Sequence, residues 1–232
     1  MNKTSTLTLR VLAHLLSYPD ATLREHLGEM QAALQQERAL NPARLAELGA
    51  LMQRLASPRT MDTEAAYVET FDRGRGTALH LFEHVHGDSR DRGPAMVDLI
   101  KTYEQAGLYL APGELPDHLT VVLEYASTQP PAAAREFLRE IAHILQQIFS
   151  ALLRRESPYA TVLAAVLDLA GERAQAVKIP DEPALDESWE EPLAFDGCST
   201  LGQARRGQPQ TIQITRRPTA GAAAPLQPGA RT

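Results

Sequence analysis

The side chains best suited to chemistry gather between residues 71 and 93, where three histidines and a glutamate lie close together: His80, Glu83, His84 and His86. The run from His80 to His84 matches H-x-x-E-H, a motif of zinc-dependent proteases. The spacing predicts a short helix over residues 77–86, and on a helix His80 and His84 share one face, as two metal ligands must. A helical metalloprotein that uses His80, Glu83 and His84 is therefore one hypothesis.

A structural role competes with this metal site. A catalytic zinc needs a third protein ligand and an open position for water, and no spacing in the sequence singles out a third ligand. The imidazoles can instead hydrogen-bond carbonyl groups at a helix end, or pair with Glu83 and the aspartates that follow it. Because so short a match arises by chance in many chains, the sequence favours the structural role.

Two pairs of arginines flank the histidines: Arg73 and Arg75 on one side, Arg90 and Arg92 on the other. Placed near glycines, their guanidinium groups could bind a carboxylate, a phosphate or the pyrophosphate of a cofactor. Alternatively, neighbouring aspartates neutralise them in local salt bridges, and we expect this for half of the arginines. The candidate aspartates are Asp72, Asp88 and Asp91.

A second polar cluster consists of Glu114, Asp117 and His118 around Pro116. Proline suits the first position of a helix, and Asp117 would then lie in the first turn, where a negative charge complements the helix dipole. That role does not account for Glu114 and His118, so a partner-binding role stands beside the structural one. No serine or cysteine in a strained turn accompanies the Asp–His pair, which argues against a hydrolase.

Helices must position these residues, because apolar residues recur at spacings of three and four up to about residue 170. The pattern predicts an all-α fold, a single helical-bundle domain of about nine helices over residues 1–175. The longest predicted helix follows Pro131 and has this apolar stripe: Phe137, Ile141, Leu145, Ile148 and Leu152. A chain of 232 residues can bury such a core without disulfides or metals.

Residues 176–232 differ in composition. Pro180 and the residues after it include 7 of the 16 prolines, and residues 181–196 contain seven acidic side chains and no basic one. Such proline density and segregated charge predict a largely disordered tail. Residues 185–196 are an exception, because their apolar side chains could dock on a partner or on the helical body: Trp189, Leu193 and Phe195.

Charge and hydropathy exclude several classes of function. The formal net charge is −6, which disfavours polyanions, so we expect no nucleic-acid binding. No apolar run reaches the roughly 20 residues that a membrane-spanning helix needs, and the first ten residues do not resemble a secretory signal. The single cysteine, Cys198, allows no internal disulfide. These features predict a cytoplasmic protein without membrane insertion.

Longer motifs around the polar clusters resemble the NarJ family of nitrate reductase assembly chaperones. The matching runs are Tyr67-x-x-x-Phe71-Asp72-Arg73-Gly74-Arg75, residues 81–87, residues 89–93 and residues 114–119. Residues 16–20 and 184–191 are similar too, and the resemblance covers most of residues 7–196. These motifs are far more specific than the zinc-like pentapeptide. A general helical adaptor, unrelated to molybdoenzymes, is the remaining alternative.

The resemblance implies a system-specific chaperone that is not an enzyme. Such proteins bind the apo form of the catalytic (alpha) subunit of respiratory nitrate reductase, including its N-terminal peptide. They hold it for insertion of the molybdenum bis-guanine-dinucleotide cofactor and delay its docking to the membrane anchor. We therefore expect no stably bound cofactor or metal. Cofactor-biosynthesis proteins are further expected partners.

The resemblance also implies a client-peptide groove on the helices that carry the motifs. We expect apolar anchors and polar groups for orientation and release, with histidines that could make affinity depend on pH. The candidate residues are Tyr67, Phe71, Arg73, Arg75, Phe82, Glu83, His84, His86, Glu114, Asp117, His118 and Tyr125.

Overall fold

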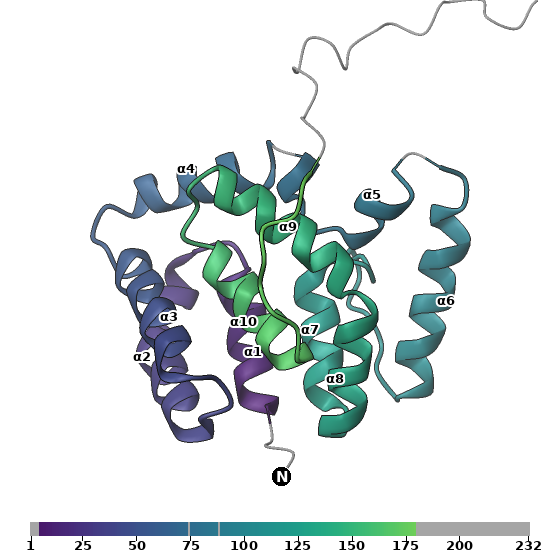
Figure 1. The fold of residues 1–232 in the computed structure, drawn as a ribbon, viewed down its shortest axis with the longest axis horizontal. Helices are drawn as coiled ribbons and strands as arrows, with labels where there is room; N and C mark the ends of the chain where they lie inside the picture. The colour runs from purple at the N-terminus through teal and green to yellow at the C-terminus, as the bar shows by residue number, and fades with distance from the viewer. Residues whose placement is uncertain (1–4, 74, 88, 180–232) are drawn as a thin grey trace, which may run out of the picture. The chain divides into compact units, whose positions relative to one another are not determined.

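The computed structural model describes residues 5–73, 75–87 and 89–179. These residues form ten α-helices and one 3-10 helix (Figure 1). The elements are α1 (Thr6–Leu15), α2 (Ala21–Glu37), α3 (Pro42–Leu55), α4 (Thr60–Phe71), η1 (Arg75–Thr77), α5 (Leu81–Val85), α6 (Arg92–Gln105), α7 (Leu119–Thr128), α8 (Pro131–Glu140), α9 (Ala142–Arg154) and α10 (Ala160–Ala170). The predicted all-α class is confirmed.

Local sequence signals set several helix ends. The Asp20 side chain accepts a hydrogen bond from the backbone N–H of Leu23 at 2.8 Å and so caps α2. Asn41 caps α3 in the same way, and Pro42 takes the first helical position. Gly171 ends α10 with a φ of 82°, a left-handed conformation that glycine adopts without a steric penalty. These ends were predictable because each depends on residues close in the chain.

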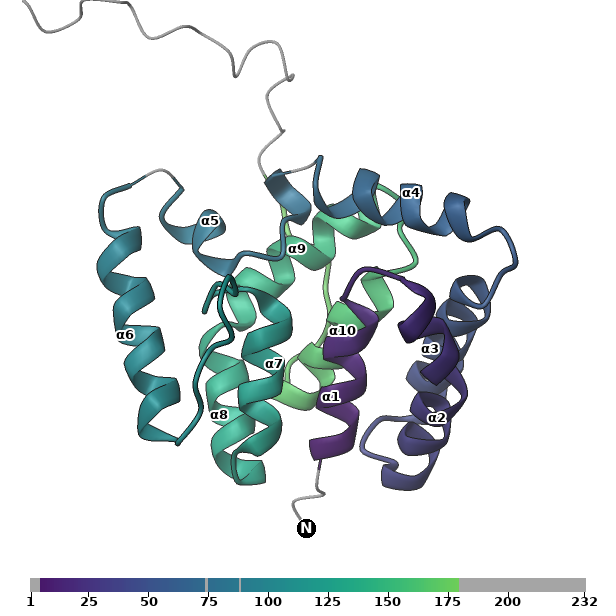
Figure 2. The same ribbon diagram turned by 180° about the vertical axis from the view of Figure 1, so that it is seen from behind.

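Helix α10 is the centre of the core. Most of its side chains are buried, as is typical of a helix that is apolar on all sides. It packs against α8 and α9 and also touches α1 and α3. Helix α1 in turn packs against α7 and α2, and Figures 1 and 2 show α1 and α10 between the α2–α3 pair and the α7–α8 pair. The site described below lies on the α7 side.

The prediction of one long helix after Pro131 is wrong in one respect. The structure divides this segment at Ile141 into two helices, α8 and α9. Ile141 has φ −92° and ψ 2°, and the His143 Nδ1 lies 3.2 Å from the Glu140 carbonyl oxygen beside the break. Both helices pack against α10. The change of direction at Ile141 allows α8 and α9 each to direct its apolar face toward α10. No glycine or proline marks the break, so the continuous apolar stripe concealed it.

Residues 172–179 follow α10 and run along α9 (Figure 1). The backbone N–H of Val177 donates to Ser150 Oγ at 2.8 Å, and that of Gln175 donates to Gln146 Oε1 at 3.1 Å. The remainder of the predicted tail, with the expected docking segment at residues 185–196, lies outside the described residues. Within the described residues, no helix has the length and hydropathy to cross a bilayer.

Candidate functional site

The two polar clusters of the sequence meet where the chain enters α5 and α7. The Leu81 N–H donates to the Asp117 carbonyl at 3.0 Å, and the Leu119 N–H donates to the Leu79 carbonyl at 2.8 Å. These bonds form an isolated antiparallel bridge between His80 and His118. The bridge joins segments that are far apart in sequence and places their histidine rings edge to face, with centroids 4.9 Å apart.

Asp117 is the buried centre of this junction, with no exposed surface. Its Oδ2 accepts a hydrogen bond from the backbone N–H of Phe82 at 3.2 Å. The His80 Nδ1 lies 3.5 Å from Oδ1, and an Arg92 guanidinium nitrogen lies 3.7 Å from Oδ2. One carboxylate therefore ties the start of α5 and the start of α6 to the entry of α7.

Opposite pKa shifts distinguish the two histidines. The contact with Asp117 raises the pKa of His80 above its usual value, although burial acts in the other direction. Burial and the charge of His80 lower the pKa of His118. Burial disfavours the charged form of Asp117, but the contact with His80 and the Phe82 N–H outweigh it and lower the pKa of the carboxyl group. Near neutral pH, His80 therefore holds a proton more readily than His118.

The structure corrects the predicted role of Asp117. Helix α7 begins at Leu119 with His118 at the N-cap position, so Asp117 precedes the helix instead of lying in its first turn. Its carboxylate serves a contact between distant segments, which helix-start rules cannot reveal. His118 is half-buried, and its Nδ1 lies 2.6 Å from Thr120 Oγ1.

The geometry expected of the metal site is also absent. His80 precedes α5, in an extended conformation, so it does not share a helical face with His84. The His84 Nε2 lies 2.9 Å from the Ala78 carbonyl oxygen, while His80 faces Asp117. In the described ranges, no group of three or more histidine, cysteine or acidic side chains is placed to hold a metal ion. The motif match reflects residue order alone.

Among the described residues, Arg73 and Arg92 form ion pairs with other carboxylates than the aspartates that the sequence suggested. Arg73 pairs with Glu69 one helical turn earlier, at 3.1 Å, and both side chains are exposed. Arg92 reaches Glu83 at 3.6 Å in addition to Asp117. Arg75 is exposed at the start of η1. Arg92 thus takes a structural position that only the approach of α6 to α5 creates.

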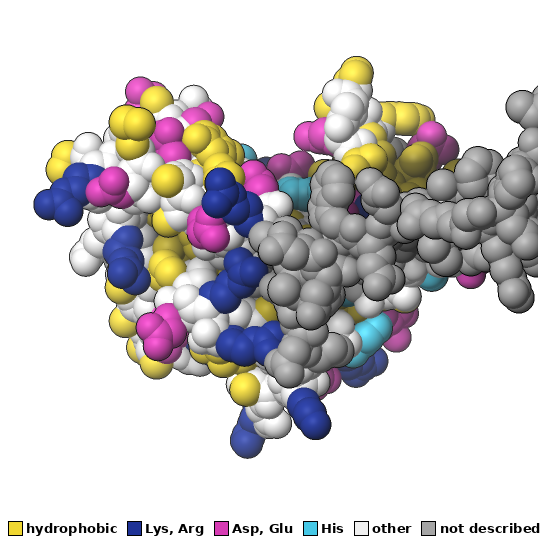
Figure 3. Space-filling model, turned by 90° about the horizontal axis from the view of Figure 1, so that it is seen from above, with side chains coloured by type: hydrophobic (Ala, Val, Ile, Leu, Met, Phe, Trp, Pro, Cys, Tyr) yellow, Lys and Arg dark blue, Asp and Glu magenta, His cyan; other side chains and the backbone are white. Residues whose placement is uncertain are grey.

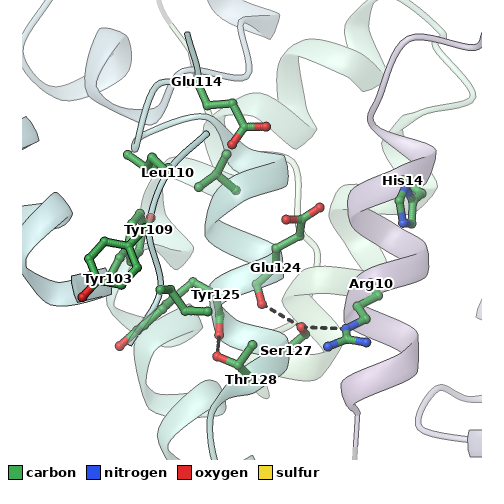
Figure 4. Close-up of a pocket in the computed structure, with 12 residues that line it drawn as sticks. Arg10, His14, Tyr103, Tyr109, Leu110, Glu114, Glu124, Tyr125, Ser127 and Thr128 are labelled. Carbon is green, nitrogen blue, oxygen red and sulfur yellow. Dashed lines mark hydrogen bonds between the residues drawn. The ribbon is translucent and has the colours of Figure 1, made fainter. Parts of the chain in front are cut away.

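A pocket of about 410 Å³ opens between α1, α7 and residues 108–114, next to this junction (Figure 4). Tyr103 and Tyr125 form one wall, with ring centroids 4.8 Å apart. The Tyr109 side chain is 81% exposed. The lining residues are Arg10, His14, Tyr103, Leu108, Tyr109, Leu110, Glu114, Val121, Glu124, Tyr125, Ser127 and Thr128. Apolar and aromatic groups with a few charged ones are typical of binding pockets.

Hydrogen bonds hold the segments on the two sides of this pocket in place. The Tyr103 hydroxyl donates to the Pro116 carbonyl at 2.8 Å, which fixes the end of α6 to the connection that follows it. The Arg10 Nε donates to Ser127 Oγ at 3.3 Å, which links α1 to α7. Figure 4 shows the side chains of Glu114, Glu124 and Arg10 around the pocket, with Glu124 nearer to Arg10. The rim carries two carboxylates and one guanidinium group, so it is suited to a partner with basic side chains.

Tyr67 and Phe71 lie elsewhere, in the hydrophobic core. Only 7% of Tyr67 is exposed, and its hydroxyl donates to the Leu16 carbonyl at 2.7 Å. Its ring contacts those of Tyr18, Phe71 and Tyr159. In this conformation neither Tyr67 nor Phe71 can reach a partner, so both have structural roles. Their aromatic character suggested anchors because the sequence does not show which helix face is covered.

The predicted residues thus fall into separate places. Glu114 and Tyr125 line the pocket. The half-buried members at or beside α5 are Phe82, Glu83, His84 and His86. Sequence reasoning missed the contribution of α1, because Arg10 and His14 are ordinary polar residues on its exposed face. Only the packing of α1 on α7 shows that they border the pocket.

Comparison with known proteins supplies the family. Residues 17–165 match the family model described as nitrate reductase delta subunit. The chain is 42% identical over 228 residues to the nitrate reductase molybdenum cofactor assembly chaperone NarJ of Escherichia coli strain K12, covering 89% of this chain and 97% of that protein. It is 38% identical over 193 residues to NarW of the same strain, named as a probable chaperone of the same kind, covering 79% and 80%.

A solved structure supports the fold. A protein from Archaeoglobus fulgidus, described as a redox enzyme maturation protein, superimposes with a TM-score of 0.50 and 21% identity. The match covers 72% of this chain and 94% of that one. At this identity the likeness concerns the fold alone.

Proposed function

This chain belongs to the nitrate reductase delta subunit family, and we propose that it is an assembly chaperone for a nitrate reductase. The observation that carries the proposal is its 42% identity to Escherichia coli NarJ across nearly the whole of both chains. In this role the chain binds its client and contributes no catalytic residue. This proposal takes the place of the metalloprotein hypothesis, whose helical geometry the structure does not contain.

We further propose that the client is the apo catalytic subunit and that its N-terminal peptide binds at the pocket between α1 and α7. An amphipathic peptide helix can lay its apolar side into such a groove. Tyr109, Leu110 and Tyr125 offer apolar contact, and Glu114 and Glu124 favour basic side chains on the peptide. The junction around Asp117 supports the site by holding α5 and residues 108–118 in place.

The later steps follow from the same binding. While it is held, the client receives its molybdenum bis-guanine-dinucleotide cofactor, which is the client's cargo and not a group that belongs to this chain. The chaperone delays docking of the client to the membrane anchor until insertion is complete. We place these steps in the cytoplasm, where cofactor-biosynthesis proteins are further partners.

Calorimetric titration of the full chain with the N-terminal peptide of a nitrate reductase catalytic subunit tests the proposal. We expect saturable binding that Tyr109→Ala weakens several-fold. Met61→Ala is the matched control, because Met61 is 80% exposed on α4, away from the pocket. Phe82→Ala and His118→Ala show whether the α5 side belongs to the site. If no heat is released and the client subunit does not co-purify, the chaperone proposal fails and a general helical adaptor becomes the better hypothesis.

A further inference from the structure

Helix α6 is the least covered of the long helices in the described part of the chain. Of its fourteen residues only Tyr103 is buried. Met96, Leu99 and Ile100 are half-buried, and Val97 is 49% exposed. None of these side chains belongs to the continuous hydrophobic core that the other helices share. Figures 1 and 2 both show α6 at the edge of the helical body.

The apolar side chains of α6 form one stripe. Met96, Ile100 and Tyr103 follow one another at spacings of four and three residues, with Leu99 beside Ile100, so they lie on the same face of the helix. A helix of a globular protein normally buries such a stripe against another element. Seen from above, hydrophobic side chains crowd the upper right of the described surface, on the side where Figure 1 places α5 and α6 (Figure 3).

This stripe continues into the pocket. Tyr103 belongs to the last turn of α6, and it is also a wall of the pocket between α1 and α7. After α6 the chain reverses at Gly107, whose φ of 78° is left-handed. It then supplies Leu108, Tyr109 and Leu110 to the same pocket. Apolar side chains therefore continue from the α6 stripe, through Tyr103, to the pocket residues Leu108, Tyr109 and Leu110.

We propose that the apolar stripe of α6 is a second wall of the client site, and that the client peptide helix extends from the pocket onto α6. This inference rests on the function proposed above. The occupant is helical because an apolar stripe of about two helical turns matches the apolar side of a helix better than it matches a loop. It carries basic side chains, because Glu114 and Glu124 line the pocket and α6 presents an exposed Glu104 directly after Tyr103.

The experiment follows amide hydrogen exchange of the full chain with and without the N-terminal peptide of a nitrate reductase catalytic subunit. In the free chain, amides of residues 96–103 should exchange faster than those of α7 and α10, because little core packing protects them. At saturating peptide, residues 96–103 should become protected together with residues 108–110. Protection confined to residues 108–110 and α7 would overturn the inference while leaving the proposed function intact.

A substitution provides the second measurement. Val97, three residues before Ile100, borders the stripe at its exposed edge. Val97→Asp should therefore raise the peptide Kd several-fold with no change in thermal unfolding, because the side chain is already half exposed. Met61→Asp introduces the same charge at an exposed apolar residue of α4 and should leave the Kd unchanged. An unchanged Kd in Val97→Asp would show that the peptide does not reach α6. Absence of any binding to the unaltered chain would instead contradict the proposed function.

Discussion

His80 and His118 face each other across an isolated bridge, with ring centroids 4.9 Å apart, and their pKa values shift in opposite directions. The difference arises because His80 turns its Nδ1 toward the buried carboxylate of Asp117, whereas the Nδ1 of His118 meets the hydroxyl of Thr120. A proton on the pair is thus held at His80 in preference to His118. The location of that proton leads to the first prediction.

The stability contribution of His80 should depend on pH. Contact with Asp117 raises the pKa of His80 in the folded chain, so its stabilisation is complete below the unfolded pKa of about 6.5 and is lost as pH rises through the folded pKa. Urea unfolding of the unaltered chain and of His80→Gln should therefore differ at pH 5.5, by on the order of 1 kcal/mol, and converge at alkaline pH. A difference that grows with pH would contradict the assignment.

His118 should behave in the opposite way. Burial lowers its pKa in the folded chain, so its neutral form is favoured, and that stabilisation is lost as pH falls below the unfolded pKa. A histidine NMR titration should place the midpoint of His80 above that of His118. Reversed midpoints would show that the carboxylate does not control the pair.

Asp117 should be important for stability because its carboxylate has no exposed surface and accepts the Phe82 N–H. Asp117→Ala leaves that donor and His80 without their partner and takes one of two carboxylates from Arg92, and we expect a loss of about 3 kcal/mol in unfolding free energy. Asp117→Asn keeps an acceptor for Phe82 and should lose less. Asp117→Asn should also lower the NMR-measured pKa of His80. Equal losses in the two variants would argue against a role for the Phe82 hydrogen bond.

Tyr67 should affect the fold and not client affinity. Tyr67→Phe removes the hydroxyl that donates to Leu16 and should cost about 1 kcal/mol, with an unchanged Kd for the client peptide. Tyr67→Ala empties a core position and should cost about 3–5 kcal/mol. Urea unfolding and calorimetric titration measure the two effects. Weaker peptide binding by a fully stable Tyr67→Phe variant would indicate that Tyr67 takes part in client binding after all.

The rim charges of the pocket should contribute to client binding. Glu124→Lys reverses a carboxylate that faces the proposed peptide, and we expect a several-fold higher Kd for a peptide with lysine or arginine side chains. Added salt should weaken binding to the unaltered chain more than binding to this variant. Glu136→Lys on α8, exposed and outside the pocket, is the control. If Glu124→Lys and Glu136→Lys change the peptide Kd equally, Glu124 does not contact the peptide.

Local sequence was sufficient for much of the fold. The caps at Asp20 and Asn41 and the apolar spacing that predicts helices act between residues a few positions apart, so they are legible without coordinates. The long motifs around residues 67–93 and 114–119 pointed to the family, and the comparisons confirm it. The sequence did not show which faces of those helices are buried. For this reason Tyr67 and Phe71 were expected as anchors for the client peptide, although they lie in the core.

Contacts between distant segments decided the rest. His80 leaves the predicted helix to form a bridge with His118, and Asp117 turns inward to meet the start of α5. Helix α8 ends at Glu140, directly before Ile141, because α8 and α9 each pack on α10. The pocket exists because α1 brings Arg10 beside Ser127, more than a hundred residues later in the chain. Each arrangement follows from burial and hydrogen bonding across the folded chain, which residue spacing along the sequence does not encode.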